Sequence, residues 1–133
     1  MSTATTIVTG VDFVCVPSSD FDAALEFYGE VLGLERSSLW QRGDDPPVGA
    51  EFETGNMTIA VIATKSIGLE FQPNTVPIAL RVDDVAAARA ELESRGVTFA
   101  GDTIDSGVCH MANFRDPEGN ALQLHHRYAP FNR

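Results

Sequence analysis

Hydrophobic positions in this chain of 133 residues follow two periods, one typical of helices and one typical of strands. Apolar residues recur at helical spacing over residues 21–32, between Asp20 and Gly33. A second such stretch begins after Asp83-Asp84 and ends at Gly96. Asp is favoured at a helix N-cap and Gly just past the last turn, so both stretches predict helices with defined ends. The other apolar runs predict strands at residues 11–16, 34–41, 50–54, 57–64, 78–82, 97–100, 107–114 and 121–126.

The order of these elements repeats, with one strand, one helix and three strands in each half. The two halves align at a constant offset of 63 residues, from Asp20 and Gly33 to Asp83 and Gly96. One module of about 60 residues buries its sheet poorly alone, so the two modules are expected to pack as one unit. The sequence thus predicts an α+β fold with residues 1–133 as a single domain. The first βαβββ module spans about residues 7–66 and the second about 75–128.

Charge and composition narrow the class of partner. Nine Lys and Arg against 19 Asp and Glu give a formal net charge of −10, which opposes binding to nucleic acid and to anionic membrane surfaces. A small organic cation fits this charge better. No apolar run reaches the roughly 20 residues of a membrane-spanning helix, and the first ten residues lack a signal-peptide pattern. We therefore expect a cytoplasmic protein in which Cys15 and Cys109 are reduced, buried thiols.

Three segments carry a resemblance to a known family: Asp20–Glu35 (DFDAALEFYGEVLGLE), Arg81–Val85 (RVDDV) and Asp116–Asn120 (DPEGN). Together they resemble the vicinal oxygen chelate superfamily, which includes glyoxalases, bleomycin-resistance proteins and extradiol dioxygenases. The resemblance covers about residues 7–127. It implies the glyoxalase/bleomycin-resistance-like fold, in which the sheets of two βαβββ modules curl around a central cavity. It also implies a homodimer.

Metal-dependent members of the resembled family place four ligands, mostly His and Glu, in that cavity. The resemblance puts these positions at Phe13, Ala60, Pro77 and Gln123 in this chain. Phe, Ala and Pro have no side-chain donor atom, and Gln is a weak neutral donor. We therefore expect no metal and no other cofactor. The resemblance then points to the metal-free branch, which includes the resistance-type binding proteins.

Strand alternation extends the candidate cavity wall, because side chains two residues apart lie on the same face. Cys15 then shares the face of Phe13, and His125 shares the face of Gln123. The same reasoning places Arg81 on the cavity face of the fifth strand.

The two-residue turn Gly55-Asn56 predicts a hairpin register that pairs Glu53 with Thr58 and Glu51 with Ala60. Paired residues share a face, so both glutamates line the cavity if Ala60 does. The same alternation is typical of a half-exposed strand with its glutamates in water, and this alternative stays open.

Two further residues have both a structural and a functional interpretation. His110 lies in an apolar strand, where it is either a core histidine or part of the site. Trp40, beside the polar loop 42–47, is either a core residue or a lid that stacks on a flat ligand. The candidate ligand-binding residues are Phe13, Cys15, Trp40, Glu51, Glu53, Ala60, Arg81, His110, Gln123 and His125.

These residues support three hypotheses. The first is a metal-independent binding protein that sequesters a small organic ligand, with a cation as a candidate. An alternative is a metal-independent lyase, isomerase or epimerase with Glu51 or His125 as the base and Arg81 or Gln123 stabilising an oxyanion. A second alternative is a metal-dependent glyoxalase- or dioxygenase-like enzyme with displaced ligands, drawn from Glu51, His110 and His125.

Overall fold

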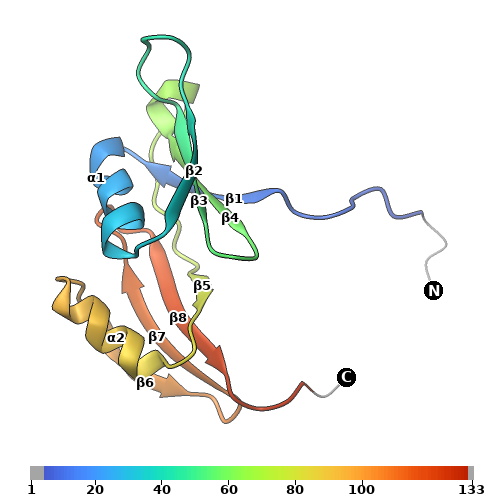
Figure 1. Cartoon of the computed structure of the whole chain (residues 1–133), viewed down its shortest axis with the longest axis vertical. Helices are drawn as coiled ribbons and strands as arrows, with labels where there is room; N and C mark the ends of the chain where they lie inside the picture. Colours follow the sequence, from blue (N-terminus) through green and yellow to red (C-terminus); the bar gives the residue numbers. More distant parts are fainter. Residues whose placement is uncertain (1–4, 132–133) are drawn as a thin grey trace.

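A computed structural model describes residues 5–131 and contains two open, four-stranded sheets (Figure 1). Sheet A has the order β1-β4-β3-β2 and sheet B the order β5-β8-β7-β6, with one parallel pair in each. The two βαβββ modules are therefore confirmed, and neither sheet closes into a barrel. The strands are β1 (Phe13–Ser18), β2 (Glu35–Trp40), β3 (Gly49–Glu53), β4 (Thr58–Ala63), β5 (Ile78–Arg81), β6 (Phe99–Asp105), β7 (Cys109–Arg115) and β8 (Ala121–Arg127).

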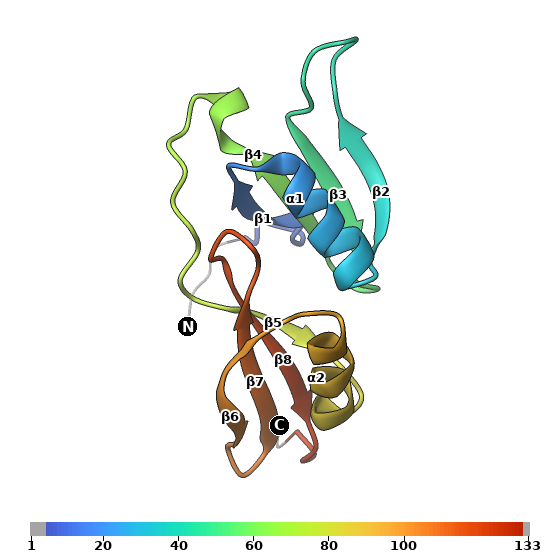
Figure 2. The same ribbon diagram turned by 90° about the vertical axis from the view of Figure 1, so that its left-hand side faces the viewer.

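The helices lie on the same side of the two sheets, as Figures 1 and 2 show. In the first module α1 (Phe21–Glu26) continues as the π-helix η1 (Phe27–Val31), and in the second module α2 (Val85–Ser94) covers sheet B. A short 3-10 helix, η2 (Thr64–Ile67), begins the connection between the modules. Alternate strand residues face the helices and belong to one buried apolar cluster, which includes Val16, Phe52, Ile59, Phe114, Leu122 and Leu124. The intervening residues of each strand lie on the face that no helix covers.

The π-helical turn explains a departure from the predicted repeat. Asp20 caps α1 and Asp84 caps α2, each accepting a hydrogen bond from the backbone N–H three residues on. The caps are therefore 64 residues apart, whereas the left-handed glycines that follow the helices, Gly33 and Gly96, are 63 apart. The first helix holds one residue more than the second, and a wide π turn is how a helix accommodates such an insertion. The constant offset of 63 is wrong at the helix starts for this reason.

Two strand boundaries also differ from the apolar pattern. β1 continues through Pro17 to Ser18. It is an edge strand, where a residue without an N–H costs no ladder hydrogen bond. β6 continues to Asp105 through a register shift between Ala100 and Ile104. A bulge of this kind carries a strand through polar residues that an apolar pattern does not mark.

The turn at residues 116–120 joins the second module to the first. Asp116 accepts a hydrogen bond of 2.9 Å from the Tyr28 hydroxyl, and Asn120 Nδ2 donates to the Pro17 carbonyl at 2.9 Å. Burial, reinforced by the Asp116 carboxylate, raises the pKa of Tyr28, which keeps its hydroxyl a donor. Glu118 accepts hydrogen bonds from the backbone N–H groups of Ser19 and Asp20, at 2.6 and 2.7 Å. Partial burial raises the pKa of Glu118, but these and other hydrogen bonds outweigh it, and the pKa is lowered overall.

Candidate functional site

The helix-free face of sheet A brings six of the ten candidate residues together. The β3–β4 register pairs Glu53 with Thr58 and Glu51 with Ala60, as the two-residue turn predicts. β1 pairs with β4 so that Cys15 lies beside Ala60. The expectation of a buried thiol is wrong for Cys15, which is exposed on the face that no helix covers, whereas Cys109 is buried. The residues gathered on this face are Phe13, Cys15, Trp40, Glu51, Glu53 and Ala60.

Two aromatic rings meet across this face. Phe13 and Trp40 belong to the opposite edge strands of sheet A, yet their ring centroids are 5.5 Å apart in an edge-to-face arrangement. The rings therefore reach over the two central strands, where Ala60 is completely buried. Gly49 makes this possible, because a Cβ atom there would lie 2.9 Å from Cε3 of Trp40 and 2.8 Å from the carbonyl oxygen of Val61.

The two glutamates on this face differ in how fully their carboxylates are bonded. Glu53 accepts hydrogen bonds from the hydroxyls of Ser37 and Thr58, which lower its pKa and occupy both carboxylate oxygens. Glu51 accepts one bond, from the Trp40 indole N–H to Oε2 at 3.0 Å. Among the described residues no hydrogen bond occupies Glu51 Oε1. Glu51 is therefore the carboxylate that can accept a further donor, beside two aromatic rings.

The helix-free face of sheet B holds three more candidates. Arg81 pairs with His125, and Gln123 lies one row further along the same face. The Gln123 side chain donates from Nε2 to Asn113 Oδ1 at 2.9 Å, so the two amides form a polar pair across β7 and β8. Strand alternation predicts that Arg81, Gln123 and His125 lie on one face of the sheet, and the register of β5 and β8 agrees with this prediction.

His110 is separated from the other candidates. The register pairs it with His126, whereas His125 pairs with Met111, so His110 and His125 lie on opposite faces of sheet B. His110 Nε2 lies 3.4 Å from a carboxylate oxygen of Asp105, and its ring packs on Tyr128 with a centroid distance of 4.7 Å. The set Glu51, His110 and His125 is therefore not gathered into one site. No group of three His, Cys, Asp or Glu side chains within residues 5–131 is placed to hold a metal ion.

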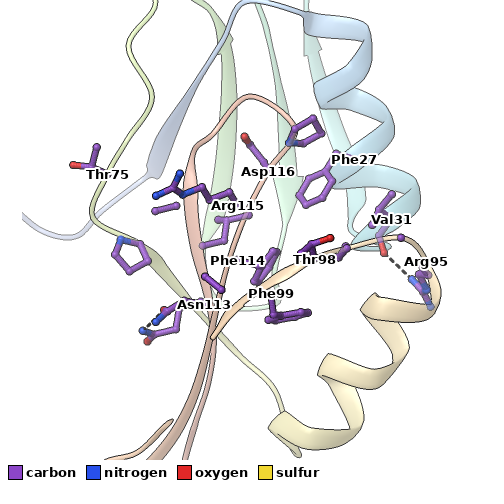
Figure 3. Close-up of a pocket in the computed structure, with 18 residues that line it drawn as sticks. Phe27, Val31, Thr75, Arg95, Thr98, Phe99, Asn113, Phe114, Arg115 and Asp116 are labelled. Carbon is purple, nitrogen blue, oxygen red and sulfur yellow. Dashed lines mark hydrogen bonds between the residues drawn. The ribbon is translucent and has the colours of Figure 1, made fainter. Parts of the chain in front are cut away.

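A hollow of about 960 Å³ lies where the two modules meet (Figure 3). Phe27 and Val31 of η1 form one wall, and Phe99, Asn113 and Phe114 of sheet B form another. Pro77 and Gln123 also line it, but the aromatic pair and the glutamates of sheet A do not. The two halves of the candidate site therefore belong to different surfaces of a single chain.

Comparison with known proteins agrees with this architecture. The sequence model of the glyoxalase/bleomycin resistance protein/dioxygenase superfamily matches residues 10–124. The chain belongs to this superfamily. A search of curated proteins finds no match.

Several solved structures are similar to this chain. TnmS3, an antibiotic-binding protein from Streptomyces sp. CB03234, is 25% identical over 92% of this chain and 99% of its own, with a TM-score of 0.75. A glyoxalase/bleomycin resistance protein from the same organism is 26% identical over 86% of this chain and 97% of its own, with a TM-score of 0.68. A superfamily member from Sphaerobacter thermophilus shares the fold at 23% identity, over 90% of this chain and 98% of its own, with a TM-score of 0.76.

The residues present do not fit the metal of the metal-dependent superfamily members. The four positions that the resemblance assigns to the metal ligands, Phe13, Ala60, Pro77 and Gln123, supply one side-chain oxygen between them. The Gln123 amide is held by Asn113, and an amide oxygen alone is too weak a donor set for a divalent ion.

Every helix in residues 5–131 is too short or too polar to cross a membrane.

Three residues of the site were not found from the sequence. Gly49 leaves room for Trp40, Ser37 bonds to Glu53 from a bulge in β2, and Asn113 holds Gln123. A hairpin register counted back from the turn at 116–120 would have paired Asn113 with Gln123. Neither Gly49 nor Ser37 carries a local signal, because their roles depend on contacts between strands.

We expect Gly49→Ala to displace Trp40 from the face of sheet A. The added methyl group must move the indole or the strand, at a cost of about 1–3 kcal/mol in stability. Trp40 is the only tryptophan, so its emission maximum should shift to the red as the ring becomes more exposed. Gly29→Ala is the matched control, because a Cβ there makes only an ordinary contact of 3.5 Å with Phe52. An unchanged Trp40 emission in Gly49→Ala would contradict the tight packing described here.

Proposed function

We propose that this protein binds and sequesters a flat organic cation, without a metal ion, on the helix-free face of sheet A. The observation that carries the proposal is the hydrogen bond between Trp40 and Glu51, which sets a carboxylate against an aromatic pair. Aromatic faces attract cations, and a carboxylate with an unoccupied oxygen binds ammonium or amidinium donors. The bound molecule would lie against Phe13 and Trp40, with its charge at Glu51.

The comparisons support small-molecule binding as the role of this site. TnmS3 is described as an antibiotic-binding protein and resembles this chain over nearly its whole length. The donor chemistry at the four metal positions favours binding over Lewis-acid catalysis. Sequestration needs only affinity, which the aromatic and acidic groups supply.

The proposal includes the setting in which the protein acts. The net charge of −10 attracts cations and repels nucleic acid, so we place a small molecule, and no nucleic acid or membrane, among its partners. We also propose a cytoplasmic location and a homodimer.

Two dyes with the same ring system and opposite charge test the proposal. Rhodamine 6G is a xanthene cation, and fluorescein is a xanthene anion. We expect rhodamine 6G to show a rise in fluorescence anisotropy on titration with the protein, with a Kd in the range of about 1–100 μM. Fluorescein should bind at least about tenfold more weakly.

Thermal unfolding, followed by circular dichroism, extends the test to ethidium and methylene blue, which are also flat aromatic cations. A ligand that binds only the native state raises the midpoint, and the stabilisation grows with the logarithm of 1 + [L]/Kd. The proposal is wrong if none of the three cations binds at about 1 mM, a concentration at which even weak ligands of this size are detectable.

A further inference from the structure

A second hollow, of about 540 Å³, lies on the helix side of the molecule. It is found where α2 and β5 of the second module face the first module, whose wall comes from β1 and the β3–β4 hairpin (Figure 2). Its volume falls within the range of about 300–1,000 Å³ that is typical of small-molecule sites. The six candidate residues on the helix-free face of sheet A do not line it. The hollow is therefore a separate place on the same chain.

The wall of this hollow is aliphatic. Within the described residues its apolar lining contains no aromatic ring. It includes Val14, Leu34, Ile59, Ile78, Leu80 and Leu92. Leu34, Ile78 and Leu80 pack against the core but remain partly exposed, so the core is open at this point. Flat ring systems stack on aromatic planes, whereas a flexible hydrocarbon chain can follow a wall of branched side chains. The lining therefore favours an alkyl chain as the bound group.

The free edge of β5 gives this hollow a polar rim. β5 is the outer strand of sheet B, and Ala79 and Arg81 of this strand line the hollow. The Val82 N–H donates to the His125 carbonyl at 3.0 Å. Alternate residues of a parallel edge strand bond to its one neighbour, so the N–H groups of Ala79 and Arg81 point to the free edge. Backbone N–H groups and a guanidinium are the donors that a carboxylate accepts from most strongly.

The charged residues that line the hollow leave one positive charge unbalanced. Glu91 and Arg95 both line it, and they form an ion pair in which Glu91 Oε1 lies 3.1 Å from Arg95 Nη2. Arg81 forms no ion pair with a described residue. Acidic groups further away act weakly here, because charges more than about 8 Å apart are largely screened at physiological ionic strength. The hollow therefore combines an aliphatic wall with a positively charged rim, in a chain whose net charge is −10.

We infer that this hollow binds an aliphatic carboxylate, a fatty acid of medium chain length, with its carboxylate at Arg81 and its alkyl chain along the aliphatic wall. Both modules line the hollow, so a bound chain would also stabilise their packing against each other. This second site does not depend on the cation proposed for sheet A, because it lies on another surface and takes a ligand of the opposite charge.

The head group and the chain length of the ligand can be tested separately. We expect isothermal titration to give a Kd of about 10–500 μM for decanoate, used below the concentration at which it forms micelles. Octanoate should bind at least about fivefold more weakly, because each buried CH₂ group contributes about fourfold in affinity. Decyltrimethylammonium has the same alkyl chain and should bind at least about tenfold more weakly than decanoate, since Arg81 repels its head group.

Two substitutions on the same helix locate the bound chain. Ala88 lines the hollow, whereas Ala90 is exposed on α2 and does not line it. Ala88→Phe fills the space and should weaken decanoate binding at least about tenfold, and Ala90→Phe should leave it within about twofold. Circular dichroism melts show whether both variants are folded. A cation bound on sheet A would not respond to Ala88→Phe, so the two sites are distinguished.

Arg81→Gln tests the head group without adding volume, and it keeps the test decisive if Ala88→Phe does not fold. It should weaken decanoate binding about fivefold to tenfold. Arg42→Gln makes the same charge change in the exposed loop between β2 and β3 and should have an effect below about twofold. Decanoate that at about 1 mM gives neither heat of binding nor a higher Tm would overturn the assignment. So would equal losses in Ala88→Phe and Ala90→Phe, an unchanged affinity in Arg81→Gln, or a decyltrimethylammonium affinity equal to that of decanoate.

Discussion

Replacing Asp116 by alanine is expected to lower the free energy of unfolding by about 3–5 kcal/mol. The Asp116 carboxylate is buried, with 5% of the residue exposed, and it accepts four hydrogen bonds. Two come from side chains that are themselves buried, the Tyr28 hydroxyl at 2.9 Å and Asn120 Nδ2 at 2.8 Å. Each buried donor left without a partner costs about 1–3 kcal/mol.

Asp116 lies between the two modules, so removing its carboxylate is expected to weaken the coupling between them as well as the turn itself. Tyr28 belongs to the first module, and the turn that contains Asp116 also holds Asn120 against the Pro17 carbonyl. We expect the unmodified chain to unfold in one urea transition, because these bonds couple the two sheets. Asp116→Ala should lower the urea midpoint. It should also separate two transitions that coincide in the unmodified chain: the one followed by Trp40 fluorescence, which reports on the first module, and the one followed by circular dichroism, which reports on the whole backbone.

Two variants show whether the effect belongs to these bonds. Tyr28→Phe removes one of the four donors and should cost about 1 kcal/mol. Asp102→Ala changes an exposed aspartate of β6 and should stay within about 0.5 kcal/mol of the unmodified protein. A loss below about 1 kcal/mol in Asp116→Ala would contradict the role given to this turn.

The parts of the site that follow from local geometry could be predicted from the sequence. The Gly55-Asn56 turn fixes the β3–β4 register, so the shared face of Glu51, Glu53 and Ala60 follows from counting outward from the turn. Alternation along β8 likewise placed His125 with Gln123. These inferences succeed because side chains alternate strictly between the two faces of a strand. Once the face of one residue is known, the face of each remaining residue in that strand follows.

The remaining parts depend on contacts that local patterns do not encode. Phe13 and Trp40 meet because their side chains reach toward each other over the two central strands of sheet A, and Gly49 leaves the space. The extra residue in the first helix is visible only once the caps are known to be Asp20 and Asp84. The apolar strand around His110 is compatible with either face of the sheet. Only the pairing of His110 with His126 places it on the face opposite to His125.

Removing the Trp40 ring is expected to weaken binding of an aromatic cation more than any other single change on this face. Trp40→Ala removes the stacking surface, the partner of Phe13 and the donor to Glu51. A desolvated cation–π contact together with the lost stacking area is worth about 2 kcal/mol, so the affinity for rhodamine 6G should fall about 30-fold. Trp40→Phe keeps an aromatic ring without the indole N–H and should lose about threefold to tenfold. An unchanged affinity in Trp40→Ala would place the ligand elsewhere.

The contribution of charge is isolated by Glu51→Gln, which preserves the size of the side chain and its ability to accept the Trp40 bond. An ion pair beside an aromatic ring and partly removed from water contributes about 1–2 kcal/mol, so the affinity for rhodamine 6G should fall about tenfold. Fluorescein should bind no worse, since the change removes a repulsive charge. Glu30→Gln makes the same net charge change on the exposed surface of η1, on the helix side, and should leave both affinities within about twofold. Equal losses for Glu51→Gln and Glu30→Gln would mean that net charge alone attracts the cation. A loss confined to Glu51→Gln would assign the recognition of charge to this carboxylate.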